Sequence, residues 1–249
     1  MKTLLNPQKL PRLTLVLGVT GMVLQNLLFS FAADEKDLLT AHPLGFILAA
    51  LTVAAIALII AGVFRWNSEA LVPVWPNSPQ VPHLAAVLGF GAILLDGGFA
   101  DSRLVLVRNV LAVASMASLV ALFVLDRKEK EHHFGLYTVL CLFFAVHLVS
   151  CYQGWSSNPQ IMVYLFTLLA YVGLMLYFYH KAAALVGFRK EKTLLAFGLL
   201  AVFFCYASWE VRELSSLLHL CCGAWVLTDL CREFSGELPE TLPQDPSGE

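Results

Sequence analysis

The segment Leu94–Asn109, LLDGGFADSRLVLVRN, decides how this chain folds. It places Asp96 shortly before, and Arg108 shortly after, a turn between two long apolar runs. If the turn lies near residues 100–102, the two charges stand at similar depths on neighbouring helices. A charged group inside a bilayer is costly and usually pairs with another group or lines a polar cavity. The segment therefore predicts a hairpin of two membrane-spanning helices joined by an Asp96–Arg108 ion pair.

The composition supports this membrane assignment. Of the 249 residues, 58% are hydrophobic and 14% are charged, whereas a soluble domain carries about 25% charged residues. The formal net charge is −2 and no large basic patch occurs, so we expect no nucleic-acid partner. The six cysteines lack the paired spacing of a zinc or redox site and are expected to be small apolar packing residues.

Apolar runs on both sides of the hairpin have the length needed to cross a bilayer, about 20 residues. Together they predict eight spans, at about 13–31, 44–64, 84–98, 104–125, 134–152, 161–179, 193–208 and 214–230. We expect residues 1–232 to form a single all-α, multi-pass helix bundle. The acidic, proline-containing tail 233–249 is predicted to be disordered.

The first span has an alternative interpretation as a signal peptide. Ser30-Phe31-Ala32 resembles a small-x-small cleavage site. However, the charge-free run from Leu13 to Phe31 is longer than the roughly 7–15 apolar residues of a signal-peptide core, which favours a retained helix.

The Lys and Arg residues predict the orientation of the bundle. Twelve of the 16 fall on the side that holds the N-terminus, and four fall on the other side. Because cytoplasmic loops carry the excess of basic residues, both termini are predicted to be cytoplasmic. Short loops and the absence of an acceptable glycosylation sequon suggest a bacterial plasma membrane.

Polar side chains gather toward the predicted outer ends of the spans. The candidate ligand-binding or polar cluster consists of Gln25, Asp96, Arg108, His147, Glu210 and His219. Most of these residues share a helix face with Gly, Ala or Ser at helical spacing. Small residues mark helix–helix contacts in membranes, so we expect the cluster to face the bundle interior.

The predicted cytoplasmic halves of the spans look different. Asp229, at the rim of the last span, is the one charge expected there. The histidines on this side are expected to be solvated or to contact lipid headgroups: His83, His132, His133 and His180. The sequence thus predicts a polar outer side and an apolar inner side.

Two interpretations of the outer cluster remain open. The first is helix packing, in which each buried hydrogen bond contributes about 0.6 kcal/mol. The second is an outward-opening site where Asp96, Arg108, His147 and His219 converge, because ionisable residues inside a membrane commonly mark function.

Three functional hypotheses follow. The first is a non-enzymatic protein that binds, senses or scaffolds at the outer face, with the lipid bilayer and a protein or small molecule as partners. The second is a small permease whose vestibule is the cluster. The third is a metal-dependent intramembrane hydrolase using His147, His219 and Asp96. A haem with His147 and His219 as axial ligands is a separate possibility. No HExxH, phosphate loop or serine elbow occurs, so no catalytic residue is assigned and no cofactor or metal is expected.

Overall fold

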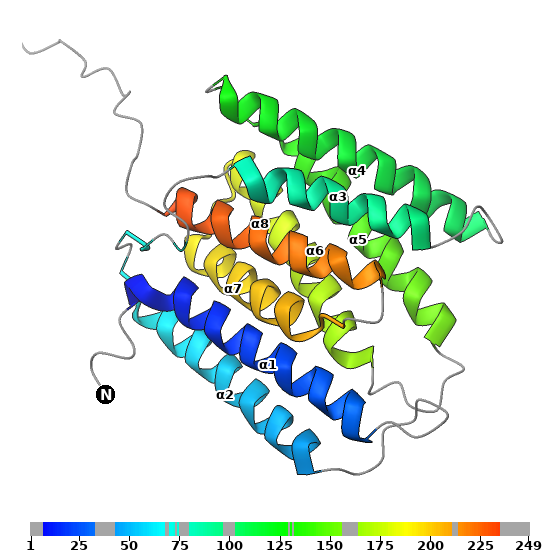
Figure 1. The fold of residues 1–249 in the computed structure, drawn as a ribbon. Coiled ribbons are helices and arrows are strands. Elements are labelled where there is room, and N and C mark those ends of the chain that lie inside the picture. Colours follow the sequence, from blue (N-terminus) through cyan, green and yellow to red (C-terminus); the bar gives the residue numbers. More distant parts are fainter. Residues whose placement is uncertain are drawn as a thin grey trace, which may run out of the picture.

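Every regular element in the described part of the chain is helical (Figure 1). The computed structural model describes residues 7–32, 43–67, 70–72, 74, 80–96, 103–128, 130, 132–155, 164–210 and 214–234. The α-helices in these ranges are α1 (Leu10–Ala32), α2 (Pro43–Arg65), α3 (Gln80–Asp96), α4 (Arg103–Arg127), α5 (Phe134–Trp155), α6 (Leu165–Leu185), α7 (Glu191–Ala207) and α8 (Leu217–Glu233). Short 3-10 turns precede α1 (η1, Pro7–Lys9) and α8 (η3, Leu214–Ser216). A helix thus overlaps each of the eight predicted spans.

Six helices form a closed ring. From α3 to α8 each helix packs against the next, and α8 packs against α3. The α1–α2 hairpin packs against α7 on the outside of this ring (Figure 1). In the most apolar stretch of α8, 61% of the residues are buried, against 22% to 39% in the other candidate spans. Helix α7 is buried along most of its length as well, so α7 and α8 are the two most buried helices of the described bundle.

The helices around α7 alternate in direction. Tyr177 of α6 contacts Asp229 of α8, and Lys181 contacts Glu233, with the same offset of 52 residues in both pairs. The second pair lies four residues further along both helices, so α6 and α8 run in the same direction. Helix α7 runs back between them.

The segment after α2 joins the start of α1 to the end of α8. The amide of Val72 donates to the carbonyl of Gln8 at 2.9 Å, and the amide of Leu71 donates to the carbonyl of Phe234 at 2.8 Å. The ring of Trp66 packs edge-on against Phe234 with centroids 5.0 Å apart. The beginning of α1, the end of α2 and the end of α8 therefore lie at one end of the bundle.

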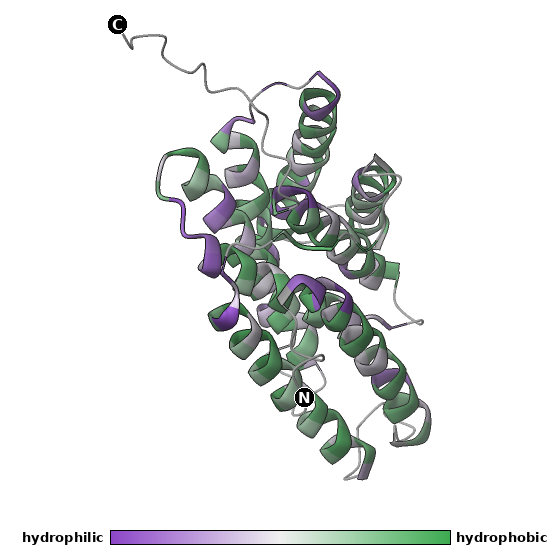
Figure 2. Cartoon of the chain, turned by 90° about the vertical axis from the view of Figure 1, so that its left-hand side faces the viewer, coloured by the Kyte–Doolittle hydropathy of each residue, from purple (hydrophilic) through white to green (hydrophobic). Residues whose placement is uncertain are grey.

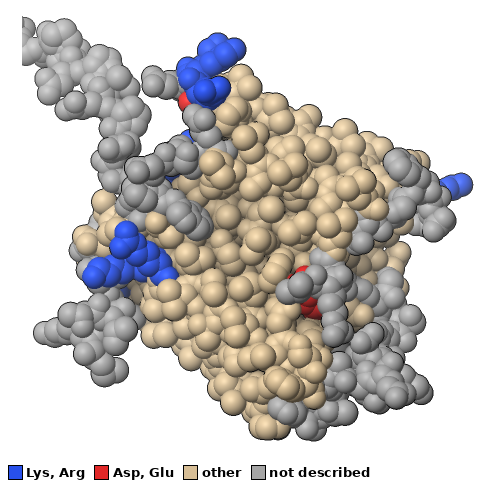
Figure 3. Space-filling model, viewed as in Figure 1, with Lys and Arg blue, Asp and Glu red and all other residues tan. Residues whose placement is uncertain are grey.

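The described surface has the character of a membrane protein. Six helices are long and apolar enough to cross a membrane: α1, α2, α4, α5, α6 and α8 with its preceding turn. Large apolar side chains are exposed along them, including Phe46 at 78% and Phe64 at 75%. Hydrophobic colouring dominates the helices in Figure 2, and the Lys and Arg atoms lie at the margins of the face shown in Figure 3. The chain is thus an all-helical, membrane-type bundle.

Glycines allow the central helices to approach closely. A Cβ added to Gly173 of α6 would lie 2.9 Å from the Cα of Ala201 in α7. One added to Gly18 of α1 would lie 2.9 Å from the Cβ of Tyr206, also in α7. Such small-residue contacts favour helix association where no hydrophobic effect operates between helices.

The end of α6 differs from the predicted span. The sequence places the end of this span at residue 179, because Lys181 looks like the start of a basic loop. The helix instead continues to Leu185, and Lys181 is buried within it. Two carboxylates of α8 pair with the lysine, which removes the cost that would otherwise exclude it from the bundle.

The predicted hairpin between α3 and α4 is described only in part. Helix α3 ends at Asp96, α4 begins at Arg103, and the two helices pack together. Residues 97–102 and the side chain of Asp96 lie outside the described residues, so the Asp96–Arg108 ion pair remains a prediction. The same holds for the predicted tail beyond Phe234.

Candidate functional site

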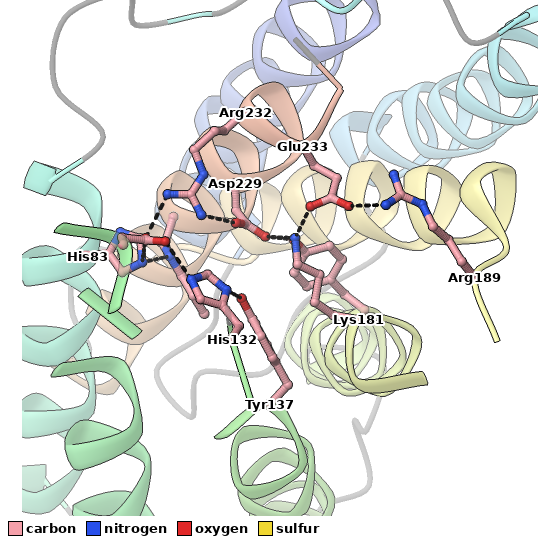
Figure 4. A network of polar contacts seen from close by, with 11 residues as sticks. His83, His132, Tyr137, Lys181, Arg189, Asp229, Arg232 and Glu233 are labelled. Atoms are coloured by element: carbon pink, nitrogen blue, oxygen red, sulfur yellow. Dashed lines mark hydrogen bonds and ion pairs between the residues drawn. The ribbon is translucent and has the colours of Figure 1, made fainter. Parts of the chain in front are cut away.

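A dense set of charged and polar side chains lies at the end of the bundle where α3 and α5 begin and α4, α6 and α8 end (Figure 4). We call it the ionic network. Its members are His83, Asp126, His132, Tyr137, Tyr177, Lys181, Arg189, Asp229, Arg232 and Glu233.

Lys181 is the buried cation of this network, with 5% of its surface exposed. Its Nζ lies 2.7 Å from Oδ2 of Asp229 and 2.8 Å from Oε2 of Glu233. The hydroxyl of Tyr177 donates a hydrogen bond to Asp229. Nη1 of Arg189 lies 3.1 Å from Oε1 of Glu233. The charges of α6 and α8 are therefore closely neutralised, as burial of ions requires.

Arg232 extends the network to α4. Its Nη1 lies 2.8 Å from Oδ2 of Asp126, and its Nη2 lies 3.7 Å from Oδ1 of Asp229. His132 donates from Nε2 to Oδ1 of Asp126 at 2.6 Å, and its Nδ1 lies 2.9 Å from the hydroxyl of Tyr137. Three carboxylates thus meet three cations, and the network links α4, α6 and α8 to the segments before α5 and α7.

Two sequence-based expectations are wrong at this end. His83 is only 6% exposed and accepts a hydrogen bond from Nε1 of Trp225 at 2.8 Å, and His132 bridges Asp126 and Tyr137, so neither is a solvated histidine. Asp229 is also not the one buried charge, because Lys181 joins it. Charge-rich loops are normally solvated, but here they fold back onto the ends of the helices.

One sequence signal could have revealed the network. Trp225, Asp229 and Glu233 follow one another at a spacing of four residues, with Arg232 beside them, so they share one face of α8. A face that begins with a large aromatic residue and continues with charges indicates a buried, paired stripe rather than a solvated one.

The opposite end of the bundle holds a smaller polar group, which we call the imidazole cluster. It consists of His147 in α5, Tyr171 in α6, Ser208 after α7 and His219 in α8. The Tyr171 ring contacts both imidazoles, with centroids 4.6 Å from His147 and 4.7 Å from His219. Both histidines are almost completely buried, at 3% and 2% exposed. Arg108 lies within electrostatic reach of His147.

The hydrogen bonds of Ser208 define the tautomer of His219. The Ser208 hydroxyl donates to the carbonyl of Cys205 at 3.2 Å and lies 3.1 Å from Nδ1 of His219. A hydroxyl has one proton, so both bonds form together only if Nδ1–H of His219 donates to Ser208. The Nε2 atom of His219 then carries a bare lone pair, and it is buried without a hydrogen-bond partner. An unsatisfied buried acceptor of this kind costs about 1–3 kcal/mol.

The other predicted site residues lie in different surroundings. Gln25 is 3% exposed on α1, and its neighbour Asn26 donates to the carbonyl of Trp209 at 2.9 Å. Glu210 takes part through its backbone carbonyl, which accepts from Ser216 at 2.6 Å. The structure therefore groups His147 with His219, buries Gln25 on α1, and places the Glu210 carbonyl in a contact between the segments that follow α7 and precede α8.

An aromatic layer separates the two polar ends. Phe143 stacks on His147 with centroids 5.3 Å apart, and Phe144 stacks on Phe178 at 5.6 Å. Phe178 in turn stacks on Trp225 at 5.3 Å, and Trp225 reaches His83 in the ionic network. The centre of the ring of helices is thus filled by flat apolar side chains.

The described residues contain no group of three or more His, Cys, Asp and Glu side chains that could hold a metal ion. Comparison with known proteins gives no match: no family model, no curated protein and no solved structure is similar to this chain.

Proposed function

We propose that this chain is a multi-pass protein of a bacterial plasma membrane that binds a small ligand at its imidazole cluster and acts as a sensor. In this proposal all eight helices cross the bilayer, and the ionic network lies on the cytoplasmic side. The Lys and Arg bias and the alternating direction of α6, α7 and α8 support it. Helices α3 and α7, with 17 residues each, are about 25 Å long, close to the hydrocarbon thickness of about 30 Å.

Reporter fusions test this topology. A fusion after Lys192 is expected to give the cytoplasmic signal of a fluorescent protein, and a fusion after Ser157 is expected to give the external signal of alkaline phosphatase. The reverse pattern at either position would remove the eight-span arrangement.

The observation that carries the binding proposal is the unpartnered Nε2 of His219. Buried polar atoms in native proteins are nearly always hydrogen-bonded, so an exception calls for an explanation. A ligand that offers an O–H or N–H group satisfies this lone pair. The ring of Tyr171 lies against His219 with centroids 4.7 Å apart and offers the flat aromatic surface that small-molecule sites usually contain.

The aromatic layer favours binding over passage. A transporter needs polar groups near the bilayer midplane that both sides can reach. Phe144, Phe178 and Trp225 lie between the imidazole cluster and the ionic network, and they offer no such polar route apart from the indole N–H already bound to His83.

A thermal-shift screen of the detergent-purified protein tests the binding site. Small alcohols, amines and carboxylic acids serve as probes, because each donates a proton in a hydrogen bond. A ligand at 100 times its dissociation constant stabilises the native state by about 2.7 kcal/mol. We expect a probe that stabilises the wild type to lose its effect in His219→Phe and to keep it in the matched control His180→Phe, whose ring lies on Phe197 outside the cluster. Equal effects in both variants would refute the site.

Elemental analysis and an absorption spectrum of the same sample test the alternative chemistry. Stoichiometric zinc, iron or haem that is lost in His147→Ala and His219→Ala would replace ligand sensing by a metal-dependent function. Protein that stabilises with an organic probe and contains no metal would support the proposal.

A further inference from the structure

His83 lies at the beginning of α3, and its Nε2 atom approaches one partner on α8 and another on α4. On α8, Nε1 of Trp225 lies 2.8 Å away. On α4, Oδ2 of Asp126 lies 3.6 Å away. The residue is 6% exposed, so water does not dominate its surroundings.

The chemistry of the two partners determines the protonation of His83. An indole N–H can only donate a hydrogen bond, so Nε2 must accept and therefore carries no proton. The approach of Nε2 to Asp126 is then a contact between two acceptors. A proton placed on Nε2 reverses both relations: the contact with Trp225 becomes one between two donors, and the contact with Asp126 becomes a charge-assisted hydrogen bond.

We propose that His83 is a pH-operated switch that exchanges Trp225 of α8 for Asp126 of α4 when Nε2 gains a proton. Arg232 of α8 binds the same oxygen of Asp126 at 2.8 Å, so protonated His83 also competes with Arg232. Both effects loosen α8 from its neighbours at this end. Acidification on the ionic-network side thereby weakens the attachment of α8 to α3 and α4.

The charges around His83 allow this exchange. From α4 it is faced by the carboxylate of Asp126, with Arg127 further out over the Phe123 ring. From α8 it is faced by Trp225 and by Arg232, which also approaches Asp229. From the segment before α5, His132 shares Asp126 with it. The carboxylate of Asp126 attracts a proton to Nε2, while the arginines limit the strength of that attraction.

His132 is the second titratable imidazole near Asp126, and the test must separate the two. Both ring nitrogens of His132 already have partners, Asp126 at 2.6 Å and Tyr137 at 2.9 Å. Protonation of His132 leaves the hydrogen bond between Trp225 and His83 in place. The indole N–H of Trp225 is therefore a direct reporter of His83.

The experiment is an NMR titration of full-length protein in micelles, labelled with ¹⁵N in its five tryptophans. The Trp225 signal is assigned with Trp225→Phe. From about pH 8 to about pH 5, the range in which histidine titrates, we expect the Nε1–H signal of Trp225 to move upfield in one step as its hydrogen bond is lost. A Trp225 signal that does not move in the wild type overturns the proposal, whatever the variants do.

Matched variants attribute the step to one histidine. His83→Gln keeps an acceptor for Trp225 but cannot gain a proton in this range, so the step is expected to disappear. His132→Gln is expected to keep it. Asp126→Asn is expected to move the midpoint to lower pH by about 1 unit or more, because the favourable charge is lost. A step that persists in His83→Gln, or that disappears only in His132→Gln, would refute the assignment to His83.

Discussion

The two polar ends of the bundle differ in how far their buried polar groups are paired. In the ionic network, Lys181, Asp229 and Glu233 are buried or half-buried, and each has an oppositely charged partner within 3 Å. In the imidazole cluster, the side chains of His147 and His219 are also buried, but Nε2 of His219 has no hydrogen-bond partner. The buried charges of the ionic network depend on one another, because removing Lys181 or Asp229 leaves an uncompensated ion. The open acceptor of His219 can still form a bond, which is why the ligand-binding proposal is placed at the imidazole cluster.

The sharpest test of this comparison is Lys181→Met, which keeps the unbranched apolar stem of the side chain and removes its charge. Asp229 and Glu233 then lose their buried cation, and we expect the free energy of unfolding to fall by about 3–5 kcal/mol in a denaturant titration in detergent. The control is Arg189→Gln, whose native side chain is 44% exposed and whose loss should cost about 0–1 kcal/mol. If Lys181→Met lowered the free energy of unfolding no more than Arg189→Gln does, the network would not hold the helices together.

The Asp96–Arg108 pair offers an intermediate test at the opposite end. We expect Asp96→Asn and Arg108→Gln each to cost about 1–3 kcal/mol, because each leaves one polar partner unpaired. The double variant should cost less than either single change, since no lone charge remains. Additive losses in a melting series would remove the predicted ion pair.

His219→Phe should have the smallest effect on stability. The change removes the unpartnered acceptor and one hydrogen bond to Ser208 while keeping a flat ring against Tyr171. These terms oppose each other, so we expect the free energy of unfolding to stay within about 1 kcal/mol of the wild type. A loss as large as that of Lys181→Met would instead assign the imidazole cluster to structure.

Much of the helix arrangement could be predicted from the sequence. Charge-free runs locate the helices because a bilayer core excludes unpaired charges, and the outer ends of the predicted spans already hold His147 and His219. Gly18 and Gly21 stand at helical spacing from Gln25 in the sequence, and both glycines pack against α7. Periodicity and depth are properties of a single helix, so a single sequence reveals them.

The ionic network could not be predicted in the same way. Several of its bonds join residues 52 or more positions apart, such as Tyr177 with Asp229 and His83 with Trp225. Before the pairing is known, Lys181 resembles a residue that ends a span. The tautomer of His219 likewise depends on Ser208 and Cys205, two residues whose position beside it follows only from the packing of α7 against α8.

The burial of α8 has a consequence for biosynthesis. Helix α8 follows the other seven described helices in the chain, packs against α3 and α7, and brings Asp229, Arg232 and Glu233 with it. Until α8 packs into the bundle, Lys181 has neither of its carboxylates and Asp126 lacks Arg232. The nascent bundle therefore carries opposite charges on separate helices that the packing of α8 neutralises together, so the late addition of α8 completes the ionic network in one step.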